Sequence, residues 1–234
     1  VGERSKSHLD FGIFASLTQY FHKGKQIKAS DLEKLIHVSV VSTFDTPLPK
    51  HAEESSSFKE LIEERPMSHL DKKLFDCMED YSYYIGNLAN KIEQHVLQGN
   101  EVTTEFVNDV YSQKHLFGNI INDLLAESGK KIDISRSKPD FVLKSGKHIS
   151  MYDLSSGEKQ LFYIMLKVLL QEKQEYIFFM DEPELSLHVD WQEKLIDKIL
   201  LLNPNCQLII STHSPSLLFQ GWDSKVINIE DLKH

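Results

Sequence analysis

Two neighbouring carboxylates, Asp181 and Glu182, follow a short apolar run in the stretch FFMDEPE. Like charges this close repel each other unless a cation or a shared proton lies between them. One carboxylate could hold Mg²⁺, which prefers one or two carboxylates together with phosphate oxygens and water molecules. The other could orient and deprotonate a water molecule. An Asp-Glu pair alone is a common pattern, but the apolar run before it and the Pro-Glu after it strengthen the prediction of a metal-dependent site.

His213 is the next candidate, in the stretch IISTHSP, where it also follows a short apolar run. An isolated histidine more often has a structural role than a catalytic one. Here the neighbouring apolar run carries Asp181 and Glu182, which reverses that expectation. The imidazole of His213 can donate a hydrogen bond to a terminal phosphate oxygen. We therefore place His213 in the same candidate site.

The stretch LSSGEKQ, residues 154–160, precedes a long apolar helical segment. Ser155 and Glu158 fit the S-x-x-E capping box, which satisfies two backbone amides of a first helical turn. The same amides, with Gly157 beside them, also form the kind of helix N-terminus that binds a phosphate. A helix cap and a phosphate site are both open interpretations of this stretch.

Short apolar strands that alternate with helices must position these residues. The alternation predicts an α/β fold with a mostly parallel sheet. The carboxyl ends of its strands form the edge where ligands usually bind, and Asp181 and His213 are both expected there. The loop of residues 185–192 leads into the next helix. Its His188 and Asp190 could face a partner, or Asp190 could be no more than the cap of that helix. The elements expected in this part are a hairpin at 138–153, helices at 157–171 and 191–201, strands at 176–180, 207–211 and 225–229, and a short helix from Ser214-Pro215.

The first half of the chain supplies further elements of this core and a helical insertion. A helix is predicted for residues 10–22 and a buried strand for 36–44, followed by a polar linker at 50–57. Residues 58–130 are charged and apolar at three- and four-residue steps, which predicts two helices joined by a turn at Gly99-Asn100. This insertion is either a plain packed hairpin or a lever that reports the state of the core. The expected domains are the N-terminal part of the core at 1–50, the helical insertion at 51–130 and the remaining core at 131–234.

The overall composition limits the classes of partner. The 234 residues carry a formal net charge of −9, with 41% hydrophobic and 26% charged residues, which suits one large globular domain or one domain with an insertion. The acidic charge argues against broad electrostatic capture of nucleic acid. Cys77 and Cys206 match no metal or redox spacing, so we expect buried or idle thiols in a reducing cytoplasm. No apolar run reaches the roughly 18 residues of a membrane helix, so we expect no membrane partner.

Three elements follow one another between residues 154 and 213: a helix N-terminus with Ser and Gly, a strand that ends in Asp-Glu, and a strand that is followed by a His. In this order they resemble the ABC-type ATPases, and specifically the branch that includes the SMC, RecF and overcoming-lysogenization-defect (OLD) proteins. The stretches DEPELSLH and STHSP are most similar to the OLD-like and RecF-like ATPases of bacterial anti-phage defence systems. The resemblance covers residues 138–230 and implies the fold of a P-loop NTPase.

The resemblance also assigns a role to each motif. Residues 154–160 look like the signature motif and residues 176–182 like Walker B with its catalytic glutamate. Residues 186–190 look like the D-loop. His213 looks like the switch histidine that senses the γ-phosphate of ATP.

Two ATPase units of this family dimerise head to tail around ATP and Mg²⁺, so the signature of one unit faces the nucleotide of the other. By this likeness, Ser155 Oγ and the amides of Ser156 and Gly157 contact the γ-phosphate that the second protomer holds. Asp181 holds Mg²⁺ through water, and Glu182 is the general base. The family's commoner signature has glycine at the position of Ser156 and glutamine at the position of Glu158. Both replacements are familiar in the SMC and RecF branch.

Three parts of the family pattern are missing. The phosphate-binding loop (Walker A) requires G-x-x-x-x-G-K-[ST], and no such stretch occurs in the sequence. We expect that the chain lacks the N-terminal part of the complete protein; the alternative is a degenerate subunit that lends its signature face to a complete partner. Residues 42–47 stand where the Q-loop belongs but contain no glutamine, although Thr43 or Asp45 could help position Mg²⁺ or water. OLD proteins carry a Toprim nuclease domain after the ATPase, and the 234 residues include none, so we expect any nuclease or toxin to be another polypeptide or to lie beyond residue 234.

Three functions follow from these observations. The first is an ATPase that forms a head-to-tail dimer, closes on ATP and so controls a separate effector, a nuclease or a toxin, in anti-phage defence. The second is a non-catalytic interaction subunit with an ATPase-like fold. The third is a DNA-repair ATPase that contacts duplex DNA, which the charge of −9 disfavours.

Overall fold

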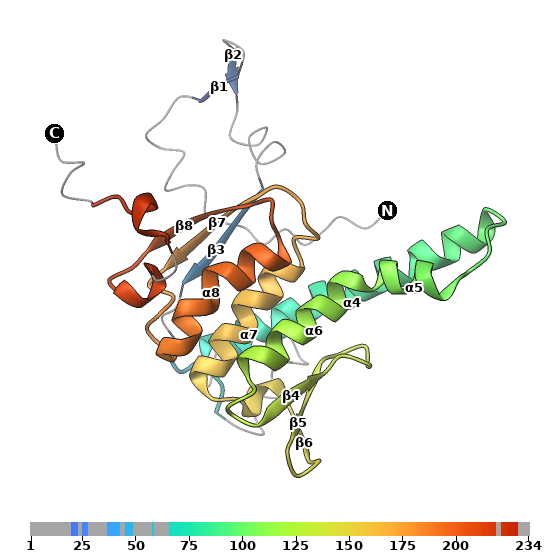
Figure 1. Ribbon diagram of the computed structural model, residues 1–234, viewed down its shortest axis with the longest axis horizontal. Coiled ribbons are helices and arrows are strands. Elements are labelled where there is room, and N and C mark those ends of the chain that lie inside the picture. Colours follow the sequence, from blue (N-terminus) through green and yellow to red (C-terminus); the bar gives the residue numbers. More distant parts are fainter. Residues whose placement is uncertain are drawn as a thin grey trace.

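The computed structural model describes residues 20–22, 25–27, 37–42, 45–48, 58, 66–218 and 221–228 (Figure 1). The helices and strands of this part of the chain are, in order, β1 (Tyr20–His22), β2 (Lys25–Ile27), β3 (Val38–Ser42), α4 (His69–Leu97), α5 (Thr104–Val110), α6 (Ser112–Leu124), β4 (Lys130–Asp133), β5 (Asp140–Leu143), β6 (His148–Ile149), η1 (Met151–Asp153), α7 (Ser156–Leu169), β7 (Tyr176–Asp181), α8 (Val189–Leu202), β8 (Cys206–Ser211), η2 (Pro215–Leu218) and η3 (Asp223–Lys225).

A parallel sheet in the order β3-β7-β8 forms the centre of the molecule. The register places Ser42, Asp181 and Ser211 side by side at the carboxyl ends of the three strands. Strands β7 and β8 are joined by helix α8, the usual crossover of a parallel pair. The predicted α/β class with a mostly parallel sheet is therefore confirmed, and so are the strands predicted in β3, β7 and β8.

Helix α7 lies beside α8 and packs against α4, α6 and α8 (Figure 1). Its side chains are buried almost all the way round, and it shares one apolar core with Val41, Phe178 and Met180 of the sheet. Full burial of such a side chain contributes roughly 1.5–3 kcal/mol. The core therefore fixes α7, and with it residues 154–160 at the helix mouth, relative to the sheet.

The opposite face of the sheet is less covered than predicted. Val40, Phe179 and Ile209 are in register across the three strands, and Val40 and Ile209 are 45% and 43% exposed. The prediction of a buried strand at 36–44 is thus wrong for the side chain of Val40, and that at 176–180 holds only in part for the half-buried Phe179. The helices that pack against the described sheet bury only the side chains that point toward α7 and α8, because successive side chains of a strand alternate between faces.

Helices α4, α5 and α6 form a hairpin that projects from the core (Figure 1). The turn lies at the predicted place, where Gly99 has a φ of +80° that a residue with a Cβ adopts only with strain. The returning arm was predicted as one helix, but it breaks at Tyr111 into α5 and α6. The base of α4 is held by Ser68 in a capping box with Asp71 and by Asp45, whose Oδ1 accepts a 2.9 Å hydrogen bond from the Leu70 amide.

The remaining predictions have mixed outcomes. The predicted hairpin is present as β5 and β6, but residues 151–153 form η1, and β4 adds a third antiparallel strand. The short helix after Ser214 is present as η2. Residues 20–22 are a strand rather than the end of a helix, and the strand predicted at 225–229 is absent from the described residues 225–228. Residues 10–19 and the linker at 50–57 lie outside the described residues.

Cys77 and Cys206 are free and buried, as predicted, and burial raises the pKa of each thiol to about 11.

Candidate functional site

Asp181 and Glu182 lie at the carboxyl edge of the sheet, where the central strand β7 ends. Asp181 is exposed between Ser42 and Ser211, its neighbours in the ladder. The Glu182 amide donates a 2.7 Å hydrogen bond to the Ser211 carbonyl, and Glu182 adopts a φ of +45°. Left-handed backbone is unfavourable for a residue with a Cβ. The chain therefore turns sharply at Glu182, with this hydrogen bond holding the strained residue against β8.

His213 faces Glu182 from the loop that follows the next strand, β8. Its Nε2 lies 3.7 Å from Glu182 Oε1, an ion-pair distance that is longer than a hydrogen bond. The side chain of His213 is 91% exposed, whereas that of Glu182 is 27% exposed. The structure thus brings together Asp181, Glu182 and His213, three of the predicted site residues, at one edge of the sheet.

The mouth of α7 is capped as the sequence predicts. Ser155 is the N-cap, and its Oγ accepts from the Glu158 amide at 3.4 Å while Glu158 Oε2 accepts from the Ser155 amide at 2.8 Å. Ser155 and Ser156 are both exposed. The cap interpretation of this stretch is confirmed. The phosphate interpretation remains compatible with it, since amides in the first turn of a helix have no partner within the helix.

Glu158 is also part of a buried ion pair. Lys130 Nζ, from β4, lies 2.7 Å from Oε1 and 2.9 Å from Oε2 of Glu158, whose side chain is 3% exposed. Burial by itself raises the pKa of Glu158, but hydrogen bonds from Lys130, from the Ser155 amide and hydroxyl and from Ser128 outweigh it and lower the pKa below its usual value. Glu158 is therefore a structural anion that fixes the mouth of α7.

Gly157 packs against the loop of residues 185–192. The Ser186 carbonyl oxygen occupies the space that a Cβ at position 157 would need, and Trp191 lies 3.5 Å from the same point. The glycine is thus required by close packing within the chain. This contact joins the signature-like stretch to the D-loop-like stretch in one protomer.

Glu184 and Gln192 belong to the site but were not predicted as functional residues. Glu184 Oε1 accepts hydrogen bonds from Thr212 Oγ1, the His213 amide and the Ser214 amide, at 2.6, 2.9 and 3.2 Å. Gln192 Oε1 accepts from Ser214 Oγ at 2.7 Å. The signals in the sequence were the glutamate after Pro183 and the glutamine after Trp191, but nothing local indicated their partners after β8.

A family model described as "AAA domain, putative AbiEii toxin, Type IV TA system" matches residues 16–218. The chain belongs to this AAA family. The family agrees with the resemblance to ATPases of the SMC, RecF and OLD-like branch, and an ATPase-type domain is thereby established for this AAA protein.

Curated relatives of this AAA protein include two retron proteins. The chain is 34% identical over 104 residues to "Retron Vc95 probable ATPase" of Vibrio cholerae serotype O1 biovar El Tor, a match covering 40% of this chain and 20% of that protein. It is 25% identical over 171 residues to "Retron Ec83 probable ATPase" of Escherichia coli, with 68% and 29% covered. The chain therefore spans less than a third of the length of each relative.

Solved structures with a similar chain course include SMC head domains. One is the SMC head domain from Thermotoga maritima, with 12% identity and a TM-score of 0.42. The match covers 86% of this chain and 56% of the SMC chain. The Smc head domain with an extended coiled coil bound to the C-terminal domain of ScpA, derived from Pyrococcus furiosus, matches 86% and 63%, with 14% identity and a TM-score of 0.41.

The residues at the sheet edge of this AAA protein fit Mg²⁺ with a nucleotide. In the described part of the chain, no group of three or more His, Cys, Asp or Glu side chains is arranged to hold a metal ion by itself. Asp181 instead offers one exposed carboxylate, which suits a cation that takes its other ligands from phosphates and water.

No helix among the described residues combines the length and apolar character needed to cross a membrane.

Two candidate residues make helix-capping contacts that bear on their predicted roles. Asp190 is not the cap of α8: the N-cap is His188, whose Nδ1 accepts from the Asp190 amide at 3.4 Å, and Asp190 is the second residue of the helix. Asp45, a candidate to position Mg²⁺ or water, uses one carboxylate oxygen to cap the start of α4. Thr43, the other candidate in that loop, lies outside the described residues.

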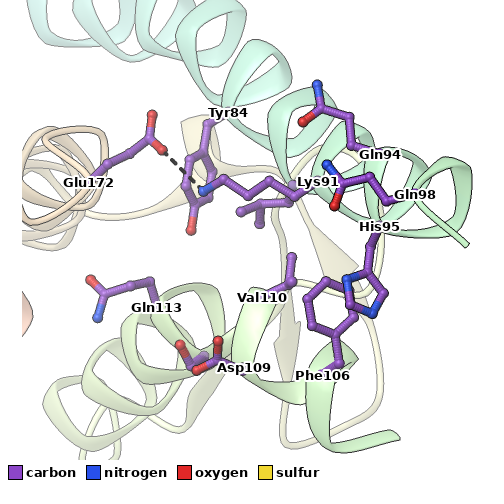
Figure 2. Close-up of a pocket in the computed structure, with 12 residues that line it drawn as sticks. Tyr84, Lys91, Gln94, His95, Gln98, Phe106, Asp109, Val110, Gln113 and Glu172 are labelled. Carbon is purple, nitrogen blue, oxygen red and sulfur yellow. Dashed lines mark ion pairs between the residues drawn. The ribbon is translucent and has the colours of Figure 1, made fainter. Parts of the chain in front are cut away.

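A separate pocket of 480 Å³ lies between the arms of the helical hairpin. Figure 2 shows Tyr84, Lys91 and His95 of α4 facing residues of α5 and α6, with Lys91 Nζ 3.9 Å from Glu172 Oε2. None of the residues that line it belongs to the predicted site. The pocket is therefore distinct from the carboxyl edge of the sheet.

Proposed function

We propose that this AAA protein binds and hydrolyses ATP with Mg²⁺ at the carboxyl edge of its sheet. The observation that carries the proposal is the meeting of Glu182 and His213 beside the exposed Asp181. Asp181 would hold Mg²⁺ through water, and Mg²⁺ would neutralise charge on the phosphates. Glu182 would orient and deprotonate the attacking water. His213, almost fully exposed, would donate a hydrogen bond to the γ-phosphate.

The proposal includes a head-to-tail dimer. Ser155 and Ser156 are exposed although the helix they begin is deeply buried. The Ser155 amide already binds Glu158, but the hydroxyl hydrogen of Ser155 and the amide of Ser156 would be available to a second molecule. A helix N-terminus favours a phosphate because its amides and its dipole point toward the anion. In the dimer, Ser155 Oγ and the amides of Ser156 and Gly157 would contact the γ-phosphate that the partner protomer holds.

The proposal further includes control of a separate effector, a nuclease or toxin, in anti-phage defence. The tip of the helical hairpin exposes three apolar side chains, Val96, Leu97 and Val102, which are 51%, 78% and 41% exposed. Four carboxylates of the same hairpin are also exposed, Glu93, Glu101, Glu105 and Asp109. Exposed apolar and acidic side chains on one hairpin favour a protein partner with a basic surface over DNA. Defence is supported only by the names of the retron relatives.

The test is Glu182→Gln in the complete gene product, with Glu175→Gln as control because Glu175 is exposed at the other end of β7. Phosphate release and the ATP-dependent molecular mass in solution are measured. We expect turnover to fall by a factor of about 10² or more, since a general base contributes on that order. ATP binding should persist, and the dimer should accumulate. Full turnover in Glu182→Gln would mean that another residue is the base.

A non-catalytic interaction subunit is the second candidate, because the 234 residues contain no G-x-x-x-x-G-K-[ST] stretch. Its signature face would then serve a complete ATPase partner. This candidate predicts no ATP affinity for the complete gene product alone and a stable complex with that partner. Micromolar ATP binding by the isolated product would exclude it.

A further inference from the structure

Glu184 binds the backbone of the loop that carries His213. It follows Pro183 in the turn between β7 and α8, and its Oε1 accepts from three consecutive residues, Thr212 through Oγ1 and His213 and Ser214 through their amides. Its other oxygen, Oε2, is shielded from solvent and accepts no hydrogen bond from the described residues. The Glu184 carboxylate therefore binds this loop through a single oxygen, Oε1.

This contact has a direct effect on the orientation of His213. The imidazole is 91% exposed, so packing does little to hold it. Hydrogen bonds to an ionised oxygen are shorter and stronger than those between neutral groups. Because Glu184 binds the amides on both sides of the His213 Cα, it sets the direction in which the side chain leaves the backbone.

Gln192 completes the connection from the other side. Its Nε2 donates to the Leu187 carbonyl at 2.8 Å and to the Glu184 carbonyl at 3.3 Å, while its Oε1 accepts from Ser214 Oγ at 2.7 Å. The residue is only 8% exposed and lies in the first turn of α8. Gln192 thus ties the loop after β7 to the loop after β8 and fixes the distance between them.

We propose that Glu184 is a positioning residue for His213, and that Gln192 holds Glu184 and the His213 loop in register. Together they set the 3.7 Å separation of His213 Nε2 and Glu182 Oε1. The inference rests on the proposed function, in which His213 contacts the γ-phosphate. It adds a requirement that the family resemblance does not contain: His213 reaches the γ-phosphate only while the Glu184 carboxylate holds the backbone of the His213 loop.

The experiment compares Glu184→Gln, His213→Ala and the double variant in the complete gene product, with Glu175→Gln as control. The substitution at Glu184 keeps the shape of the side chain but removes its charge and places an amide group without a partner at the position of Oε2. We expect kcat to fall about tenfold or more while the dissociation constant for ATP stays within about twofold. In the His213→Ala background, the same substitution should lower kcat no further, because residues that act through one another are not additive.

A second measurement does not depend on turnover. Amide hydrogen exchange of His213 and Ser214 should accelerate about tenfold in Glu184→Gln and stay unchanged in Glu175→Gln, because only the former weakens the acceptor. If Glu184→Gln does not fold, Thr212→Val removes one donor to the same oxygen. It also removes Thr212 Oγ1 as the acceptor of a 2.9 Å hydrogen bond from the Ser214 amide, so this variant is read only at the His213 amide, whose exchange should accelerate to a smaller extent.

The outcomes separate this inference from the proposed function. Unchanged exchange at His213 and Ser214, or equal losses of kcat from Glu184→Gln with and without His213, would overturn the positioning role. A wild-type product with no ATP turnover, whose exchange still responds to Glu184→Gln, would overturn the hydrolysis and leave the positioning of His213 in place.

Discussion

The carbonyl oxygen of Ser186 fills the space in which a side chain at Gly157 would begin. The two residues belong to the signature-like and D-loop-like stretches, which are therefore in direct contact within a protomer. Trp191, in the first turn of α8, lies at the same contact.

Gly157→Ala tests this close contact. The added methyl group meets backbone, which cannot rotate away, so the Ser186 loop must shift, and we expect destabilisation by about 1–3 kcal/mol. Gly86→Ala is the matched control, because Gly86 is an exposed residue inside α4 with nothing within 4 Å of the added carbon. It should be neutral or stabilising by up to about 1 kcal/mol. Urea unfolding measures both, and equal midpoints for the two variants would contradict the packing argument.

The ion pair of Lys130 and Glu158 gives a prediction with a defined pH dependence. Lys130→Met leaves the Glu158 carboxylate buried without its cation, and we expect it to destabilise by about 3 kcal/mol at pH 7. Glu158→Gln keeps the shape of the side chain and should cost less. The matched control is Asp123→Asn, which breaks the pair with Lys198 at a side chain that is 55% exposed and should change stability by about 0–1 kcal/mol.

The direction of the pH effect follows from the lowered pKa of Glu158. Its ionised form stabilises the fold above the unfolded-state pKa of about 4.3, and this contribution is lost as the pH falls through the folded-state pKa. The difference in unfolding free energy between wild type and Glu158→Gln should therefore be constant from pH 7 to pH 5 and shrink below about pH 4. A difference that grows on acidification would mean that the pKa is raised.

Trp191→Phe tests how the helical hairpin is joined to α8. The indole Nε1 donates a 2.7 Å hydrogen bond to the Leu124 carbonyl at the end of α6, and phenylalanine keeps the aromatic ring but leaves this carbonyl without its donor. We expect a loss of about 1–2 kcal/mol. Trp222→Phe is the control, since the half-buried Trp222 lies in the C-terminal segment before η3. Equal urea midpoints for the two variants would show that the indole hydrogen bond contributes nothing.

Asp181→Ala tests the metal role of the sheet edge. Removal of this carboxylate should abolish the dependence of nucleotide affinity on Mg²⁺ in the complete gene product, as measured by calorimetry with and without the metal. Glu175→Ala is a suitable control, since Glu175 is an exposed carboxylate at the other end of β7. The same Mg²⁺ dependence in Asp181→Ala and wild type would assign the metal to another group.

The sequence by itself determined the parallel α/β core and the residues at its carboxyl edge. Apolar periodicity and turn residues are local signals, so α7, β7, α8 and β8 could be predicted within a few residues of their bounds, and the capping box at Ser155 with them. Because carboxyl ends of parallel strands meet at one edge, the order of strands and helices along the chain is enough to bring Asp181 and His213 together.

Only the tertiary structure decided which distant residues support that edge. Glu184 meets Thr212 and Ser214 across about thirty positions of sequence, and Lys130 meets Glu158 across 28. Such pairs depend on how loops and layers come together, and no local pattern encodes them. For the same reason the sequence misjudged the exposed face of the sheet and the C-terminal segment, where the outcome depended on what packs against each residue.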